Sequence, residues 1–212
     1  MHTRILLTVV TVALASTAFA QDLNVYNAPE DIFQVHYASN LNKGDSVINI
    51  TNTGTMQYGG GPADNLCVNI YTFDASEEMV SCCACLVTPN ALVSLSVTGD
   101  LISNTLSPST PTSVVIKMIA TDALTKDIRF CAPGKIDPDG AILAPGMRAW
   151  GTALHALPNG TYGETETEFL NGGLSRAELV HITNFCNFII ANGSGFGICK
   201  SCRFAGLGGD KQ

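Results

Sequence analysis

The sequence predicts a mostly β protein: an antiparallel β-sandwich of about seven strands, followed by one C-terminal α-helix and stapled by disulfides. Three observations lead to this expectation. Short segments rich in Val, Ile and Thr alternate between apolar and polar residues, with turn residues between them. One later segment changes to a helical period. The chain also holds eight cysteines, an even number.

The N-terminal residues have the organisation of an export signal. A short start with Arg4 precedes the apolar run ILLTVVTVALA, which ends in the small-residue cleavage pattern AFA at 18–20. We therefore expect residues 1–20 to be a signal peptide and residues 21–212 to form a single secreted domain. The apolar run is shorter than the stretch of about 18 residues that spans a bilayer, so we expect no membrane insertion.

The overall charge is low and acidic. Charged residues make up 14% of the chain, the formal net charge is −7 and the mean hydropathy is +0.23. Removal of Arg4 with the signal peptide would bring the net charge to about −8. No basic cluster is present, so we expect no nucleic-acid partner. Because little charge covers the surface, we expect a homo-oligomer or polymer in which some apolar surface is buried.

The expected strands have apolar residues at every second position. Trp150 is expected to point inward from its strand. The segments expected to form strands are 31–40, 44–54, 66–73, 79–87, 91–99, 113–121 and 147–157. Apolar residues that share a face are Phe33, Val35 and Tyr37; Ile48 and Ile50; Val93, Leu95 and Val97; and Val114, Ile116 and Met118.

Three further segments are irregular. Residues 56–65 form an expected glycine-rich loop. Residues 122–147 are less regular, and within them CAPGKIDPDGAILAPG, 131–146, is dense in Pro and Gly, which predicts a long surface loop tethered by Cys131. The acidic segment TYGETETEF, 161–169, is either an edge strand or a loop.

Residues 174–193 predict the helix, with bounds at about 175 and 192. Ser175 and Glu178 form a capping box, and Asn192-Gly193 is a stop signal. The apolar face consists of Leu179, Ile182, Cys186 and Ile189. Cys186 on this face would tie the helix either to the sandwich or to the terminal CKSC loop.

All cysteines are expected to form disulfides, although spacing alone cannot select the pairing. The hairpin 66–73/79–87 in its simplest register aligns Ile70 with Cys82. That register places Cys67 opposite Cys85 and predicts a cross-strand bond between them. The cysteines are Cys67, Cys82, Cys83, Cys85, Cys131, Cys186, Cys199 and Cys202.

The neighbouring cysteines of the hairpin have other expected roles. Cys83 shares the face of Cys85 and would reach toward the C-terminal cysteines. Cys82 would point into the core, either as a thiol or bonded to another element. Cys199 and Cys202 have the spacing of a metal-ligand pair, an alternative that stays open, but no second pair at matching spacing is present. We therefore expect no metal.

Catalytic patterns are not found. The sequence has no GxSxG, HExxH or phosphate-binding GxxxxGK[ST] motif. His36, His155 and His181 are expected to be packed or solvated rather than catalytic. We expect no enzyme activity, no catalytic residues and no cofactor.

Three sequons are candidate glycan sites in a host with that machinery, at Asn49, Asn159 and Asn192.

Several phrases of the chain resemble a group of secreted, cysteine-rich proteins from Acidobacteria-like bacteria. These phrases are GDSVINITNTG, CVNIY, SCCACLVTPN, LISNTL, PTSVV, WGTALHALP and NGSGFGICKSC. The resemblance implies export and a shared disulfide-bearing fold. It supplies no catalytic residues.

Export, low charge, cross-linking and the lack of a catalytic set together favour a non-enzymatic structural protein, a self-assembling subunit of an extracellular fibre or matrix. Segment 31–40 would add to a neighbour's sheet, with Phe33, Val35 and Tyr37 filling its core. The alternative for this segment is pairing within its own sheet. The alternative function is a monomeric binding module or adhesin for glycans or surfaces, with Tyr58 and Tyr162 as contact residues. A secreted enzyme or metal-binding protein is a third reading.

Overall fold

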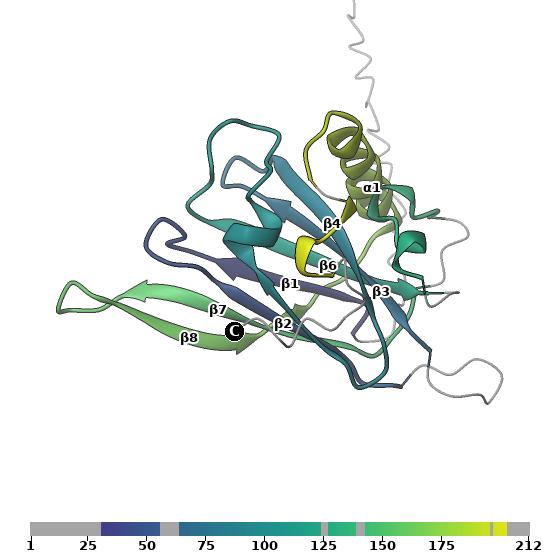
Figure 1. Ribbon diagram of the computed structural model, residues 1–212, viewed down its shortest axis with the longest axis horizontal. Coiled ribbons are helices and arrows are strands. Elements are labelled where there is room, and N and C mark those ends of the chain that lie inside the picture. The colour runs from purple at the N-terminus through teal and green to yellow at the C-terminus, as the bar shows by residue number, and fades with distance from the viewer. Residues whose placement is uncertain (1–30, 56–63, 124–126, 139–142, 196, 203–212) are drawn as a thin grey trace, which may run out of the picture.

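The protein folds into two β-sheets packed face to face, with one α-helix against the outer face of the larger sheet (Figure 1). The structure, a computed structural model, describes residues 31–55, 64–123, 127–138, 143–195 and 197–202. The expected mostly β sandwich with one C-terminal helix is confirmed. Within the described ranges, no helix has the length and apolar character needed to cross a membrane.

The larger sheet has six strands in the order β10-β4-β3-β6-β1-β9. All of its strand pairs are antiparallel except β10 with β4. Its strands are β1 (Phe33–Ala38), β3 (Leu66–Phe73), β4 (Met79–Val87), β6 (Val114–Asp122), β9 (Leu170–Asn171) and β10 (Gly197–Ile198).

The smaller sheet has four antiparallel strands in the order β5-β2-β7-β8. The β7–β8 hairpin projects beyond the rest of the sandwich, at the left of Figure 1. The acidic segment expected as an edge strand or a loop is therefore an edge strand. The strands are β2 (Val47–Asn52), β5 (Leu92–Ser96), β7 (Met147–Ala156) and β8 (Tyr162–Glu168).

The main core lies between the sheets and follows the expected alternation. Every second residue of the central strands points into this layer, where water is excluded from branched apolar side chains. Buried core residues that the sequence placed on shared faces are Ile48, Ile50, Val93, Leu95, Val97, Val114, Ile116 and Met118.

Helix α1 (Arg176–Ala191) covers the other face of the larger sheet. The Ser175 hydroxyl accepts a hydrogen bond from the backbone N–H of Glu178, as the capping pattern predicts. The Glu178 carboxylate does not close the reciprocal half of a capping box, because it pairs with Lys117 of β6 instead. All four residues of the expected apolar face are buried: Leu179, Ile182, Cys186 and Ile189.

The β3–β4 register differs from the expected one by a single residue. Next to the turn, Phe73 is opposite Met79, as the simple hairpin requires, but the register shifts at Thr72. Beyond this bulge Cys67 lies opposite Leu86, and Val68 lies opposite Cys85. A one-residue shift reverses which faces meet across a strand pair, so the predicted Cys67–Cys85 disulfide is wrong.

Trp150 does not point into the core as expected. It is half-buried on the outer face of β7, while Met147, Ala149 and Gly151 face inward. Of these, Ala149 and Gly151 are small, and at Gly151 the strand β1 approaches β7 closely. A Cβ atom on Gly151 would lie 2.5 Å from Nε2 of His36.

Short elements that the alternation did not predict lie at the sheet margins. They include the two-residue strands β9 and β10, the π-helical turn η1 (Val97–Leu101) and the terminal 3-10 turn η4 (Lys200–Cys202). The 122–147 loop contains two more 3-10 turns, η2 (Ile128–Phe130) and η3 (Pro133–Lys135). The described residues thus form ten strands where about seven were expected for the chain.

Candidate functional site

All eight cysteines form disulfides, as expected, and three of the four bonds begin in β4. Cys82 bonds Cys186 of α1 on the outer face of the sheet, with Cα atoms 5.8 Å apart. Cys186 was expected to tie the helix either to the sandwich or to the CKSC loop, and this bond shows that it is tied to the sandwich. Four disulfides indicate folding in an oxidising environment.

On the inner face of β4, two parallel disulfides hold the C-terminal tail. These tail disulfides, Cys83–Cys199 and Cys85–Cys202, have Cα separations of 4.9 and 5.3 Å. They place β10 beside β4, where Gly197 pairs with Cys83. The tail thereby covers part of the outer edge of β4, and Cys83 reaches the C-terminal cysteines as predicted.

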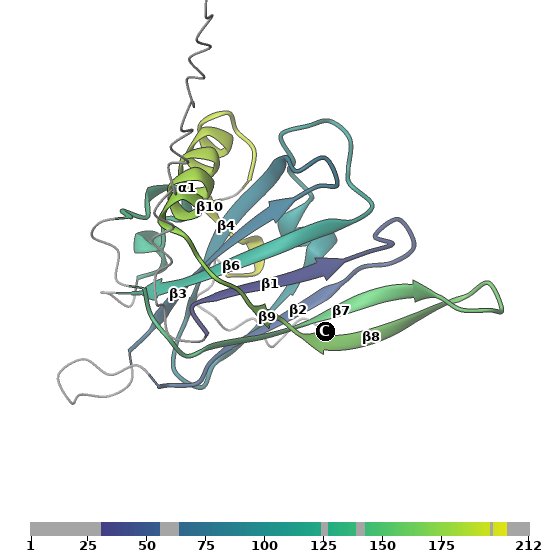
Figure 2. The same ribbon diagram turned by 180° about the vertical axis from the view of Figure 1, so that it is seen from behind.

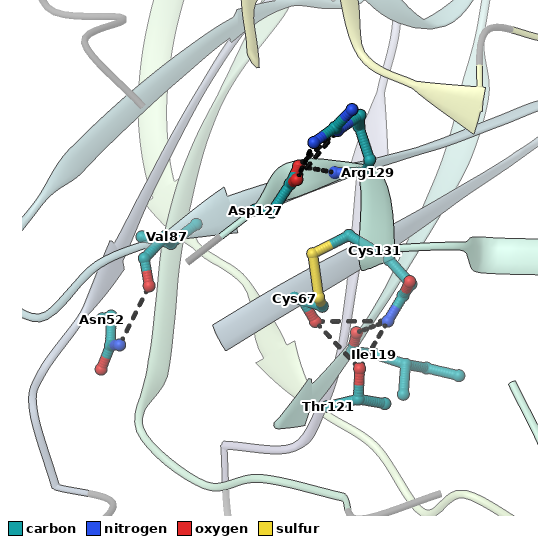
Figure 3. The surroundings of a disulfide bond; sticks show 9 residues. Asn52, Cys67, Val87, Ile119, Thr121, Asp127, Arg129 and Cys131 are labelled. Carbon is teal, nitrogen blue, oxygen red and sulfur yellow. Dashed lines mark hydrogen bonds and ion pairs between the residues drawn. A yellow bond between two sulfur atoms is a disulfide. The ribbon is translucent and has the colours of Figure 1, made fainter. Parts of the chain in front are cut away.

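The fourth disulfide, Cys67–Cys131, tethers the long loop to β3, as expected for Cys131 (Figure 3). Just before it, the Asp127 carboxylate caps η2 by accepting a hydrogen bond from the backbone N–H of Arg129. The Arg129 side chain also donates to this carboxylate. These hydrogen bonds lower the pKa of Asp127 to about 2.

Exposed sheet edges are the places where this fold can accept another strand. The edge of β4 is partly covered by β10, and β5 contacts both η1 and η4. Among the described residues, β9 pairs with the edge of β1 at Gln34 and Val35, and the Gly172 N–H donates to the Phe33 carbonyl (Figure 2). Among the described residues, β8 pairs with β7 alone, so its other edge is unpaired along all seven residues.

An open groove of about 510 Å³ lies between β1 and the projecting hairpin. We call it the edge groove. The Tyr37 side chain is 55% exposed there and that of Leu170 is 75% exposed. Five lining residues are apolar or aromatic, namely Val35, Tyr37, Val115, Ala153 and Leu170, and the others are His36, Thr167 and Glu168.

The three residues expected to act in assembly lie on one face of β1, but this is the outer face of the larger sheet. Phe33 is buried in the cluster under α1, Val35 is half-buried and Tyr37 is exposed. β1 pairs with β6 along its whole length. In this subunit β1 therefore has the intramolecular pairing that the sequence left as the alternative.

A second groove, of about 470 Å³, runs beside α1. We call it the helix groove. Its exposed apolar side chains are Leu106, Phe185 and Phe188, with Glu77 and Glu78 also in its lining. The sequence pattern does not indicate this groove, because Phe185 and Phe188 lie off the apolar face that packs on the sheet.

The three histidines within the described residues lie on three elements, and each contacts a different neighbour. His36 is stacked on Phe169 with ring centroids 4.6 Å apart, and burial lowers its pKa. His181 contacts Phe185 on α1, and Nδ1 of the exposed His155 lies 3.5 Å from the Thr165 hydroxyl. Each ring therefore has a packed or solvated position of the kind expected.

The sequons have different surroundings. Asn49 is half-buried in β2, and its side chain donates to Glu166 and accepts from Ser94. Asn159 and Asn192 are exposed in turns. Tyr162 is exposed at the start of β8, whereas Tyr58, most of the 56–65 loop and the expected signal peptide lie outside the described residues.

No group of three or more His, Cys, Asp or Glu side chains is arranged to hold a metal ion within the described part of the chain. Comparisons with protein-family models, with curated proteins and with solved structures find no match for this chain. They leave the resemblance to secreted cysteine-rich proteins as an expectation. The candidate site is therefore defined by geometry alone: the unpaired edge of β8 and the adjoining edge groove.

Proposed function

We propose that this protein is an exported, non-enzymatic structural protein, whose copies assemble into an extracellular fibre or matrix by adding an N-terminal strand to a neighbouring copy. The observation that carries the proposal is the unpaired edge of β8 beside the edge groove. Main-chain hydrogen bonds along such an edge give affinity, and side-chain pockets next to it give specificity.

The disulfides support a role outside the cytoplasm. They fasten the helix, the long loop and the C-terminal tail to the larger sheet. Covalent cross-links of this kind stabilise a fold where no chaperone or reductant maintains it. The export signal expected at residues 1–20 agrees with this location.

In this proposal the residues expected to belong to the donated strand have other roles. Because β1 is paired within its own sheet, it is not free to be donated. Val35 and Tyr37 instead line the groove that receives a neighbour's strand. Phe33 serves its own fold by packing under α1.

Electron microscopy of the native secreted protein, enriched without reductant and compared with its sizing profile, tests the proposal. Regular filaments, or a ladder of oligomers that depends on protein concentration, are the expected result. A single species with the mass of one mature chain at every concentration would reject self-assembly.

A monomeric binding module for glycans or surfaces is the second candidate, and the helix groove favours it. Phe185 and Phe188 present aromatic faces of the kind that stack on sugar rings, and Tyr162 offers another ring on the hairpin. Retention on immobilised polysaccharides, lost in Phe188→Ala or Tyr162→Ala but kept in a variant at the exposed Phe130, would support this function.

A further inference from the structure

We infer that residues 21–30 of one copy add as a strand to the free edge of β8 in a neighbouring copy, with their apolar side chains in the edge groove. The inference rests on the proposed self-assembly and names its joint. The donated strand is the segment QDLNVYNAPE, which directly precedes the described structure.

The lengths of the two strands match. β8 offers seven residues, Tyr162–Glu168, whose outer backbone groups have no strand partner among the described residues. Segment 21–30 in extended form spans roughly 33 Å, at about 3.3 Å per residue. It therefore covers the edge of β8 and leaves a short connection to Asp31.

The side-chain pattern of the segment fits the groove. Leu23 and Val25 are two residues apart, so they lie on the same face of an extended strand. On the inner side of the hairpin, Thr165 and Thr167 are paired with Ala153 and Gly151. Leu23 and Val25 on that side would contact the groove, and would cover the exposed Tyr37 and Leu170 side chains.

The charges on the outer side of β8 disfavour pairing with a second copy of β8. Its alternate residues Glu164, Glu166 and Glu168 form an acidic row on one face. Two β8 edges paired with each other would bring two such rows together, and like charges across a strand pair are destabilising. On the inferred strand the same face carries Asp22, Asn24 and Tyr26, so the strand brings one carboxylate beside this row where a second β8 edge would bring three.

The position of β9 favours a neighbouring copy over the same copy. Within one subunit, the segment would have to reverse direction through the turn at Asp31, where φ is 78°, and then run back between β8 and the outer edge of β1. That edge is already paired with β9 at Gln34 and Val35, and Asp31 is held by Arg148 at 3.2 Å. A strand supplied by another copy does not need this turn.

The joint predicts the form of the assembly. The donated segment and the receiving groove are different surfaces, so the contact is heterologous. Each copy receives one strand and donates one. Repetition of such a contact gives an open chain unless the rotation between copies closes a ring.

Two complementary variants test the inference. Deletion of residues 21–30 from the mature chain removes the strand and keeps the groove. Leu170→Glu keeps the strand and places a carboxylate in the groove, at a side chain exposed enough to be replaced without unfolding. Mass spectrometry under non-reducing conditions should first show four disulfides in each variant, as in the native protein.

The expected result is that neither variant forms filaments alone, while an equal mixture forms a dimer and nothing longer. In that dimer, Leu170→Glu donates its strand to the groove of the deletion variant. Phe188→Glu is the matched control, because it makes the same charge change at another exposed apolar side chain, in the helix groove. It should assemble like the native protein.

Other outcomes overturn the inference in distinguishable ways. Filaments formed by the deletion variant would remove segment 21–30 as the joint and leave self-assembly standing. Loss of assembly in Phe188→Glu but not in Leu170→Glu would move the joint to the helix groove. A native protein that is always monomeric rejects the proposed function. If a synthetic 21–30 peptide then binds the deletion variant, segment 21–30 fills the edge groove of its own copy and does not join two copies.

Discussion

Cys82 and Cys83 are adjacent in β4, but their disulfides leave the larger sheet on opposite faces. Cys82 reaches Cys186 of α1, and Cys83 reaches Cys199 of the tail. Successive side chains of a strand point to opposite sides, so the dipeptide fastens both layers that flank β4. The cluster SCCAC therefore acts as a cross-linking centre rather than as a metal site.

Each tail disulfide should partly compensate for the loss of the other in the free energy of unfolding. Replacing Cys83 and Cys199 together by Ala leaves Cys85–Cys202, which closes nearly the same loop. We expect the free energy of unfolding to fall by about 2–3 kcal/mol. Removing both tail disulfides frees residues 197–202 from β4, so the loss should exceed the sum of the two separate losses. Denaturant unfolding without reductant measures each value. Simple additivity would mean that other contacts hold the tail.

The contact between Gly151 and His36 predicts a steric effect. Gly151→Ala would force its new methyl group against the His36 ring. We expect a loss of about 1–3 kcal/mol in the free energy of unfolding, as for overpacked cores. Gly173→Ala is the matched control, because a Cβ atom there has no neighbour within 4 Å. Equal stabilities of the two variants in thermal unfolding would show that β1 and β7 can move apart freely.

Most of the sandwich could be predicted because its strands obey one simple rule. Strands β2 and β6 each turn one face toward the core between the sheets, so the alternation of apolar residues in the sequence shows which side chains are buried there. These side chains are Ile48 and Ile50 in β2, and Val114, Ile116 and Met118 in β6. The helix was equally readable, since the Ser175 cap and the Asn192-Gly193 stop act locally.

The disulfide pairing could not be predicted because it depends on a bulge. Near the turn, the register is the one that the simple hairpin implies, with Phe73 opposite Met79. The shift at Thr72 then moves Cys67 away from Cys85. Nothing in the alternation of either strand marks the extra residue, since both faces of β4 are buried and both tolerate apolar side chains.

The candidate site was the least predictable part. The edge groove is lined by residues of different strands, including Tyr37 of β1, Ala153 of β7 and Leu170 of β9, and the chain crosses from one sheet to the other at the buried Phe169. Such contacts between distant segments leave no periodic signal. The acidic segment 161–169 predicted either an edge strand or a loop, and the structure has the edge strand β8 there.

Burial of His36 predicts a pH dependence of stability. Burial lowers its pKa below the ordinary value of about 6.5, so on acidification the unfolded chain takes up this proton first. The stabilisation by the neutral ring is therefore complete above about pH 6.5 and is lost as the pH falls toward the lowered value. We expect the free energy of unfolding to decrease between pH 7 and pH 5, and the His36→Gln variant to lose most of this slope.

The control for this experiment is His155→Gln, since His155 is exposed on the projecting hairpin. This variant should keep the native pH dependence, followed by denaturant unfolding at a series of pH values. If His36→Gln retains the full slope, the acid sensitivity comes from another group.

Asp100 should be the main non-covalent anchor of the C-terminal tail. Its buried carboxylate accepts hydrogen bonds from the Ser201 N–H at 2.7 Å, the Ser201 hydroxyl at 2.9 Å and the Ser96 N–H at 2.9 Å. Asp100→Ala leaves two backbone donors without this acceptor, and we expect a loss of about 3 kcal/mol. Asp100→Asn keeps one carbonyl oxygen as an acceptor, so its loss should be smaller.

Hydrogen exchange separates anchoring of the tail from a general loss of stability. In Asp100→Ala the amide of Ser201 should exchange much faster, while amides of the central strands β3 and β6 change only with global unfolding. Asp127→Ala is the comparison, because it removes another carboxylate that caps a short turn, but a half-buried one. Unchanged protection at Ser201 in Asp100→Ala would mean that the tail disulfides alone fix residues 197–202 against β4.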